Sequence, residues 1–289
     1  MFKRKTQGSV LCTSCGVLVG VGDDKCYNCG RRNPALWGWA PALRELGSDL
    51  GFGPFVVGTC VIVYALTLLF DVGSVGTSGL AMLGPSPVAN FLFGATGAIP
   101  IFQYGRWWTV LSAGWLHGGV LHIFMNMMAV RQLAPAIADV YGPGRTAIIY
   151  VASSAVGFTF TSLAYIFIPP IVIIPGFIGL QGSPITVGAS ASIAGLIGAV
   201  LAYSHHTGST IAKAYASQYI IGLVVIGFLF PGIDNYAHAG GFAGGYFVAR
   251  LMNPNKQERI DHLILGAVFI GVSLLSIVAS VIHGGQFST

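Results

Sequence analysis

Long apolar stretches dominate the chain from residue 52 onward, and short polar segments separate them. Because about 20 apolar residues cross the hydrocarbon core of a bilayer as one helix, such stretches are typical of membrane spans. Seven are present, over residues 52–70, 120–137, 147–168, 187–203, 215–230, 236–251 and 263–282. The second, fourth and sixth are interrupted by Gly, Ser, His or Asn, so hydropathy alone supports them least. The pattern predicts an all-α polytopic membrane protein.

Composition and charge support this prediction. Of 289 residues, 54% are hydrophobic and 8% are charged, whereas about a quarter of the residues are charged in an ordinary soluble domain. This balance excludes a cytosolic enzyme and a disordered protein. The net charge of +5 indicates no nucleic-acid partner, because the cations form no basic stripe interleaved with aromatic side chains.

The cations lie mostly between the apolar stretches and therefore indicate a topology. With the N-terminus in the cytosol, Arg145, Lys213, Arg250 and the N-terminal cations all lie on the inner side, as the positive-inside rule requires. Arg106, in the segment 71–118, is the exception that lies outside. We therefore expect a multi-pass protein of a bacterial inner membrane, with a cytosolic N-terminus and an external C-terminus.

The segment 71–118 is too long for a simple connection between the first two spans. It carries apolar patches at 80–83 and 91–93. It also carries three tryptophans, Trp107, Trp108 and Trp115. Because tryptophan is enriched at membrane–water interfaces, we expect a partly embedded external structure whose tryptophans lie at the bilayer interface.

Two close cysteine pairs lie near the N-terminus, and a glycine follows each pair: Cys12 and Cys15, then Cys26 and Cys29. Two C-x-x-C pairs separated by ten residues have the spacing of a zinc ribbon, in which four thiolates hold a structural Zn²⁺ and leave no open position for catalysis. A reducing cytosol favours thiolate–zinc bonds over disulfides; redox dithiols or disulfides are the alternative. The ribbon either binds a cytosolic partner or caps the inner face, and the sequence leaves both open.

Polar side chains interrupt three of the predicted spans at one depth. His122 and Asn126 lie in the second, Ser190 begins the fourth, and His238 lies near the start of the sixth. At a rise of about 1.5 Å per residue, all four fall roughly 5–12 Å below the external surface. The fourth and sixth spans are expected to pack closely, because small residues repeat at every fourth position, at 190, 194, 198 and 202 and at 241 and 245.

This set of side chains permits nucleophilic acyl transfer. A serine hydroxyl is a weak nucleophile until a neighbouring base accepts its proton, and His238 is the candidate base for Ser190. Backbone N–H groups at the start of the helix, with Asn126 and His122, could hold an oxyanion. No Asp lies in the same layer, which favours a Ser–His dyad. The alternatives are that these side chains cap helices or line the pore of a transporter or channel. The common depth of polar side chains in three spans favours catalysis.

Three motifs resemble those of the rhomboid intramembrane serine proteases. They are H-x-x-x-x-H-x-x-x-N at His117, His122 and Asn126, G-x-S at Gly188 and Ser190, and A-H-x-x-G-x-x-x-G from Ala237 to Gly245. The resemblance covers approximately residues 50–251. Two positions depart from the family pattern: Ala191 replaces the last glycine of G-x-S-G, and Thr109 stands where arginine is frequent.

The resemblance implies a rhomboid-like six-helix catalytic core at 52–251, which cleaves transmembrane segments of other proteins without a metal or organic cofactor. It makes Ser190 the nucleophile and His238 the general base, and it forms the oxyanion hole from His122, Asn126 and the Ser190 backbone. Gly188 would belong to the adjoining loop, and His117 would support the external segment. A zinc ribbon at 1–34, a linker at 35–51 and a seventh C-terminal transmembrane helix within 252–289 complete the expected chain. The alternative is a catalytically silent rhomboid-like protein that binds membrane proteins or controls their quality.

Overall fold

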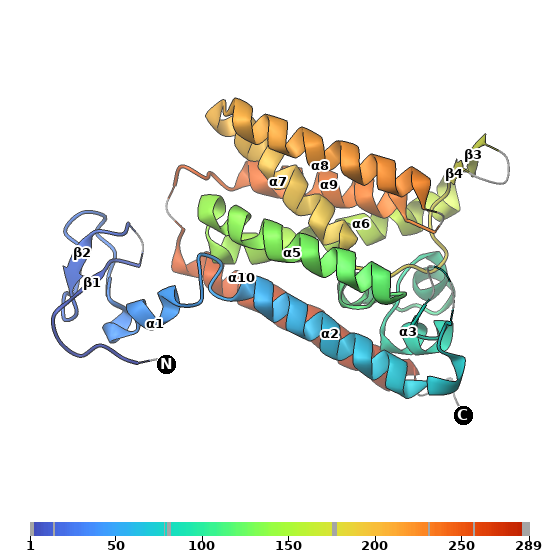
Figure 1. Ribbon diagram of the computed structural model, residues 1–289, viewed down its shortest axis with the longest axis horizontal. Coiled ribbons are helices and arrows are strands. Elements are labelled where there is room, and N and C mark those ends of the chain that lie inside the picture. The colour runs from blue at the N-terminus through green and yellow to red at the C-terminus, as the bar shows by residue number, and fades with distance from the viewer. Residues whose placement is uncertain are drawn as a thin grey trace.

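The computed structural model describes residues 3–13, 15–77, 79, 82–174, 178–230, 232–256 and 258–284. Part of the predicted apolar patch at 80–83 and the end of the predicted unit 252–289 lie outside these residues. Within the described chain, a bundle of long helices carries the strands β1 (Ser9–Leu11) and β2 (Leu18–Gly20) at one end. The helix α3 (Pro87–Phe93) and a hairpin of β3 (Ile171–Ile174) and β4 (Ile178–Leu180) lie at the opposite end (Figure 1).

Each of the seven predicted apolar stretches coincides with a long helix, although the ends differ by a few residues. These helices are α2 (Phe52–Phe70), α5 (Val120–Tyr141), α6 (Pro143–Phe167), α7 (Ser190–Thr207), α8 (Thr210–Leu229), α9 (Asn235–Leu251) and α10 (Ile260–Gly284). Among the described residues, five helices are long and apolar enough to cross a membrane: α2, α5, α6, α8 and α10. The helices α7 and α9, which begin with the predicted polar groups, are shorter than these five. The chain is thus a mostly helical membrane protein.

Local sequence decides where these helices begin and end. Gly142 and Pro143 separate α5 from α6, because proline fits the first turn of a helix and cannot continue the preceding one. At the start of α9, the Asp234 carboxylate accepts a hydrogen bond from the Ala237 N–H at 2.9 Å. Such a side-chain cap satisfies one of the free N–H groups of a helix start. This cap fixes the turn in which His238 lies.

The helix α7 packs against α5, α6, α8 and α9, and most of its residues are buried. Its glycines bring the backbones of α7 and α9 close together. A Cβ atom built on Gly198 would lie 2.9 Å from the backbone nitrogen of Tyr246, and one built on Gly195 would lie 3.1 Å from the Gly241 carbonyl. Small residues permit this kind of approach between helices in membranes. The helix α8 differs, because only 11% of its most apolar window is buried inside the protein.

The segment 71–118 folds into short helices and packs against α10, far along the chain. They are η2 (Val72–Ser74), α3, η4 (Ile99–Gln103), α4 (Thr109–Ser112) and η5 (Ala113–Trp115). Arg106 is completely buried in this segment. Its guanidinium donates hydrogen bonds to the carbonyls of Phe91, Leu92 and Ser280 at 2.7, 3.3 and 3.0 Å. A buried charge is tolerated when it is hydrogen-bonded in this way.

One prediction for this segment is wrong. Trp107 is exposed, as expected at a bilayer interface, but Trp115 is only 2% exposed. The Trp115 Nε1–H donates a hydrogen bond to the Ser273 hydroxyl of α10 at 3.1 Å. A buried indole N–H needs such a partner. Trp115 therefore joins the segment 71–118 to α10, and it does not lie at the interface.

The strands β1 and β2 pair antiparallel, with Val10 opposite Val19. Both valines are buried in a small cluster with Cys12 and Cys26. Ala35 and Ala40 also belong to this cluster. Between them lies η1 (Leu36–Gly38), and α1 (Ala40–Arg44) follows. The packing of the ribbon thus continues into residues that the sequence assigns to the linker 35–51.

Candidate active site and candidate metal centre

Ser190 is the first residue of α7 and follows a turn at Gly188. The φ angle of Gly188 is +132°, which glycine adopts more readily than other residues. The Gly188 N–H donates a hydrogen bond to the Ala113 carbonyl at 2.9 Å. Ser190 itself is partly exposed. Because the first N–H groups of a helix have no acceptor within that helix, the backbone at Ser190 offers a donor next to the hydroxyl.

His238 lies in the first turn of α9 and is 7% exposed. Its Nδ1 atom is buried and has no hydrogen-bond partner among the described residues. The Asp234 carboxylate instead accepts hydrogen bonds from the Ala237 N–H and from the Thr161 hydroxyl at 2.9 and 2.8 Å. Burial raises the pKa of Asp234 above its usual value, and these hydrogen bonds oppose that rise. Among the described residues no carboxylate is hydrogen-bonded to the His238 Nδ1.

The first turns of α7 and α9 lie against each other. A Cβ atom built on Gly157 of α6 would lie 3.0 Å from the Ala191 Cβ and 2.5 Å from the Ala237 carbonyl oxygen. Ala191 and Ala237 belong to one buried cluster with Phe158. Ala191 follows Ser190 and Ala237 precedes His238 in the chain. The two helix starts that carry the predicted nucleophile and base are therefore at the same level of the bundle.

The row of α7 that contacts α9 differs from the predicted row at 190, 194, 198 and 202. The close backbone contacts of α7 with α9 involve Ala191, Gly195 and Gly198. Ala194 and Ala202 are fully buried as well. Since α7 has small residues on more than one side, their spacing alone does not fix the rotation of the helix about its axis.

His122 and Asn126 of α5 lie beside the turn at Gly188. A Cβ atom built on Gly188 would lie 2.6 Å from the His122 Nε2 and 3.7 Å from the Asn126 Nδ2. The Asn126 Nδ2 is buried and has no hydrogen-bond partner among the described residues. The helix α5 thus places an amide donor and an imidazole beside the turn that precedes α7.

His117 lies outside this group and is fully buried behind it. Its ring stands at 70° to the ring of His122, with 5.1 Å between the ring centroids. The Gly118 N–H donates to the His122 Nδ1 at 3.4 Å, which leaves the Nε2 atom of that ring toward Gly188. This packing suits a supporting role for His117.

Two residues that position the site were not identified from the sequence. Asp234 caps α9, and an Asp directly before an apolar stretch is a known signal for a helix start. Ala113 supplies the carbonyl that holds Gly188. No side-chain property marks Ala113, because it acts through its backbone.

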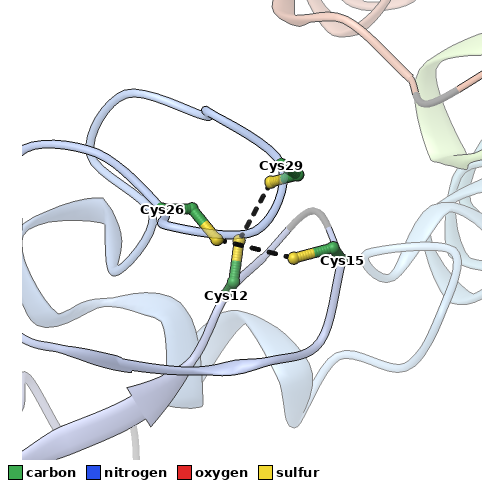
Figure 2. A group of neighbouring side chains, drawn as sticks. All are labelled: Cys12, Cys15, Cys26 and Cys29. Carbon is green, nitrogen blue, oxygen red and sulfur yellow. Dashed lines mark hydrogen bonds between the residues drawn. The ribbon is translucent and has the colours of Figure 1, made fainter.

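The four paired cysteines converge at the ribbon end of the protein (Figure 2). All four sulfur atoms lie within 4.8 Å of one another. The Sγ distances are 3.8 Å between Cys12 and Cys29 and 3.6 Å between Cys15 and Cys26. Sulfur atoms about 2.3 Å from one tetrahedral metal ion would lie roughly 3.8 Å apart. The cluster therefore fits a metal ion, and none of these thiols is in a disulfide.

The two cysteine pairs adopt the same turn. The Gly16 N–H donates to the Cys12 carbonyl at 3.0 Å, and the Gly30 N–H donates to the Cys26 carbonyl at 2.9 Å. The φ angles of Gly16 and Gly30 are +75° and +71°, so the glycine after each pair has the role that the sequence predicts. The backbone N–H of Val17 lowers the pKa of Cys15 to about 6, whereas burial raises the pKa of Cys29 to about 11. A thiolate is the form that binds a metal ion.

Comparison with known proteins identifies relatives of this chain. A family model described as Rhomboid domain matches residues 104–255, slightly more than half of the chain. The chain is similar to RHOMBOID-like protein 4 of Arabidopsis thaliana, with 30% identity over 175 residues, 58% of this chain and 39% of that protein. It is similar to Rhomboid protease GluP of Bacillus subtilis (strain 168), with 29% identity over 181 residues, 62% of this chain and 32% of that protein.

A third relative carries a different description. The chain is similar to Inactive RHOMBOID-like protein 8 of Arabidopsis thaliana, with 31% identity over 163 residues, 56% of this chain and 42% of that protein. The chain spans less than half of the length of each of these three relatives.

Proposed function

The chain belongs to the rhomboid family, and on that basis we propose that it is an intramembrane serine endopeptidase that cleaves transmembrane segments of other membrane proteins. In this proposal Ser190 is the nucleophile and His238 is the general base. The observation that carries it is the meeting of three helices at one level. The starts of α7 and α9 pack together at Ala191 and Ala237, while His122 and Asn126 lie beside Gly188.

The reaction follows from these groups. His238 accepts the hydroxyl proton of Ser190 as the oxygen attacks the carbonyl carbon of the scissile bond. The oxyanion then accepts hydrogen bonds from the Ser190 N–H, the His122 ring and the Asn126 amide. One such donor contributes about 10²–10³-fold to the rate in other serine proteases. His238 returns the proton to the leaving amine and then activates the water that hydrolyses the acyl-enzyme.

The unpaired state of one donor supports this assignment. The Asn126 Nδ2 has no hydrogen-bond partner among the residues described here, although it is buried. Buried donors without partners are rare because they are costly. A donor that is left free beside a partly exposed serine is available for an oxyanion.

We also propose the topology and the metal. The ribbon and the cations Arg145, Lys213 and Arg250 would lie on the cytosolic side of a bacterial inner membrane, with the external segment and the C-terminus outside. In that reducing compartment the four cysteine thiolates would hold one structural Zn²⁺. The metal would stabilise the ribbon and take no part in peptide-bond cleavage.

The second candidate function is a catalytically silent protein that binds membrane proteins. It is considered because one relative is named as inactive. The presence of both Ser190 and His238 in this chain favours the protease.

The test uses the full chain in proteoliposomes with a single-span reporter protein. We expect the parent to cleave the reporter and to react with a fluorophosphonate probe, and we expect Ser190→Ala and His238→Ala to do neither. Ser204→Ala is the matched control, since it makes the same change in α7 at a serine that hydrogen-bonds its own helix at the Leu201 carbonyl. Cleavage that persists in Ser190→Ala would exclude the dyad. A folded parent that binds the reporter without cutting any of a panel of spans would favour the silent alternative.

A further inference from the structure

A small cavity lies between η5, α6, α7 and α10, and apolar groups line it together with several hydroxyl groups. Its volume is about 10 Å³. Trp115 lines it from the external segment, Tyr150 and Ser154 from α6, Ser192 from α7 and Ser273 from α10. None of these residues has a role in the proposed acyl transfer.

Three hydroxyl groups in the wall of this cavity have no hydrogen-bond partner among the described residues. They belong to Tyr150, Ser154 and Ser192, which are 2%, 4% and 0% exposed. Most buried polar side-chain atoms in proteins are hydrogen-bonded. The hydroxyls of Tyr150 and Ser192 lie near each other but do not meet hydrogen-bond geometry. Three buried hydroxyl groups without a partner thus lie around the same cavity, which indicates that they share one partner.

Neighbouring serines of α6 do have hydrogen-bond partners for their hydroxyl groups. The Ser153 hydroxyl donates to the Ile149 carbonyl at 2.5 Å, and the Ser162 hydroxyl donates to the Phe158 carbonyl at 2.6 Å. Serines in membrane helices usually satisfy their hydroxyl in this way, on the carbonyl one turn earlier. Ser154, one position from Ser153, does not make such a bond and instead faces the cavity.

We propose that one buried water molecule occupies this cavity and forms hydrogen bonds with the hydroxyls of Tyr150, Ser154 and Ser192. A cavity of this volume holds about one water molecule, and a buried water typically makes about three hydrogen bonds. Empty cavities in proteins are apolar, whereas a cavity that offers two to four polar partners can hold water. The bound water links α6 to the first turn of α7, two residues after Ser190.

This proposal does not depend on the proposed function. The direction in which Tyr150→Phe changes the stability of the folded protein tests it. If water satisfies the Tyr150 hydroxyl, Tyr150→Phe removes a hydrogen bond and raises the unfolded-to-folded ratio about fivefold. If the cavity is dry, the same substitution removes an unsatisfied hydroxyl, and the ratio stays the same or falls. The measurement is equilibrium unfolding of the full chain in mixed detergent micelles.

Tyr141→Phe is the matched control. Tyr141 is equally buried, and its hydroxyl donates directly to the Ala199 carbonyl at 3.3 Å, so this variant must be destabilised. Ser192→Ala repeats the comparison if Tyr150→Phe does not fold. An experimental map at high resolution should contain one ordered peak within hydrogen-bond distance of the Tyr150 oxygen. An empty cavity in that map, or a Tyr150→Phe variant at least as stable as the parent, overturns the proposal.

Discussion

The indole Nε1 of Trp115 and the hydroxyl of Ser273 form a 3.1 Å hydrogen bond that joins the segment 71–118 to α10. A second bond of the same kind connects the Trp108 Nε1 to the Ser280 hydroxyl, also at 3.1 Å. Ser273 and Ser280 are seven residues apart and therefore share one face of α10. The segment that they hold contains Ala113, which binds the turn at Gly188. The helix α10 thus holds the segment whose Ala113 carbonyl binds the turn at Gly188.

Removal of the Ser273 hydroxyl should destabilise the protein. Ser273→Ala leaves the buried Trp115 N–H without its partner, which should cost about 1–3 kcal/mol. Ser276→Ala is the control, because the Ser276 hydroxyl bonds only the Ser273 carbonyl of its own helix. Equilibrium unfolding in micelles measures both variants. Equal effects of the two substitutions would contradict a special role for the bond between Trp115 and Ser273.

Gly188→Ala should reduce proteolysis by about 100-fold. The added Cβ would lie 2.6 Å from the His122 Nε2, so the ring must move away from the proposed oxyanion position. Gly105→Ala is the control for an alanine at a positive φ without a steric contact, since a Cβ there meets no atom within 4 Å. The rate of reporter cleavage is the measurement. A Gly188→Ala variant as active as Gly105→Ala would count against the oxyanion role of His122.

Gly241→Ala should unfold or strongly destabilise the bundle, by at least about 2 kcal/mol. Its Cβ would lie 3.0 Å from the Ala191 Cα and even closer to the carbonyl of that residue, and both are backbone atoms that cannot rotate away. Gly222→Ala in α8 is the control, because a Cβ there meets nothing within 4 Å. Thermal unfolding followed by circular dichroism distinguishes the two. Similar unfolding temperatures would mean that α7 and α9 are further apart than described.

Metal analysis of the purified full chain should find about one equivalent of zinc, as a Cys₄ site holds a single ion. Cys26→Ser should lose most of it. Cys60→Ser should retain it, because Cys60 is buried in α2 and belongs to no cluster of metal-binding residues among those described. A parent protein without bound metal after purification in zinc-containing medium would refute the ribbon assignment.

Glu258→Gln should change how stability depends on pH. Glu258 accepts a hydrogen bond from the Arg145 N–H at 2.8 Å, and burial raises the pKa of Glu258, which the contacts with Arg145 only partly oppose. A carboxyl with a raised folded-state pKa stabilises the protein below its unfolded pKa, and this contribution is lost as the pH rises through the folded pKa.

Glu258→Gln keeps an acceptor for the Arg145 N–H but cannot ionise. Its stability relative to the parent should therefore increase from about pH 4 to about pH 7. Unfolding midpoints of both proteins across this range provide the measurement. A difference that stays constant with pH would show that the carboxyl does not titrate differently in the folded state.

The features that the sequence predicted are those that depend on local chain geometry. The seven helices follow from apolar length, and the common level of His122, Ser190 and His238 follows from the constant rise of a helix. The turn after each cysteine pair follows from the glycine that the turn requires. In each case the relevant residues lie close together in the chain.

The features that the sequence did not predict depend on which distant segments become neighbours. Arg106 could be placed outside from charge counting, but not buried against the Ser280 carbonyl. Tryptophan is typical of a bilayer interface, but contacts with Phe55 of α2, Tyr150 of α6 and Ser273 of α10 make Trp115 a core residue. The rotation of α7 is similarly undetermined, because Ala191, Ala194 and Gly195 are all small enough to face α9.

The burial of Arg106 has a consequence for biosynthesis. One of its three carbonyl acceptors, that of Ser280, belongs to α10 and follows Arg106 by 174 residues. Until α10 has been synthesised and inserted, the Arg106 guanidinium therefore has only the Phe91 and Leu92 carbonyls as acceptors among the described residues.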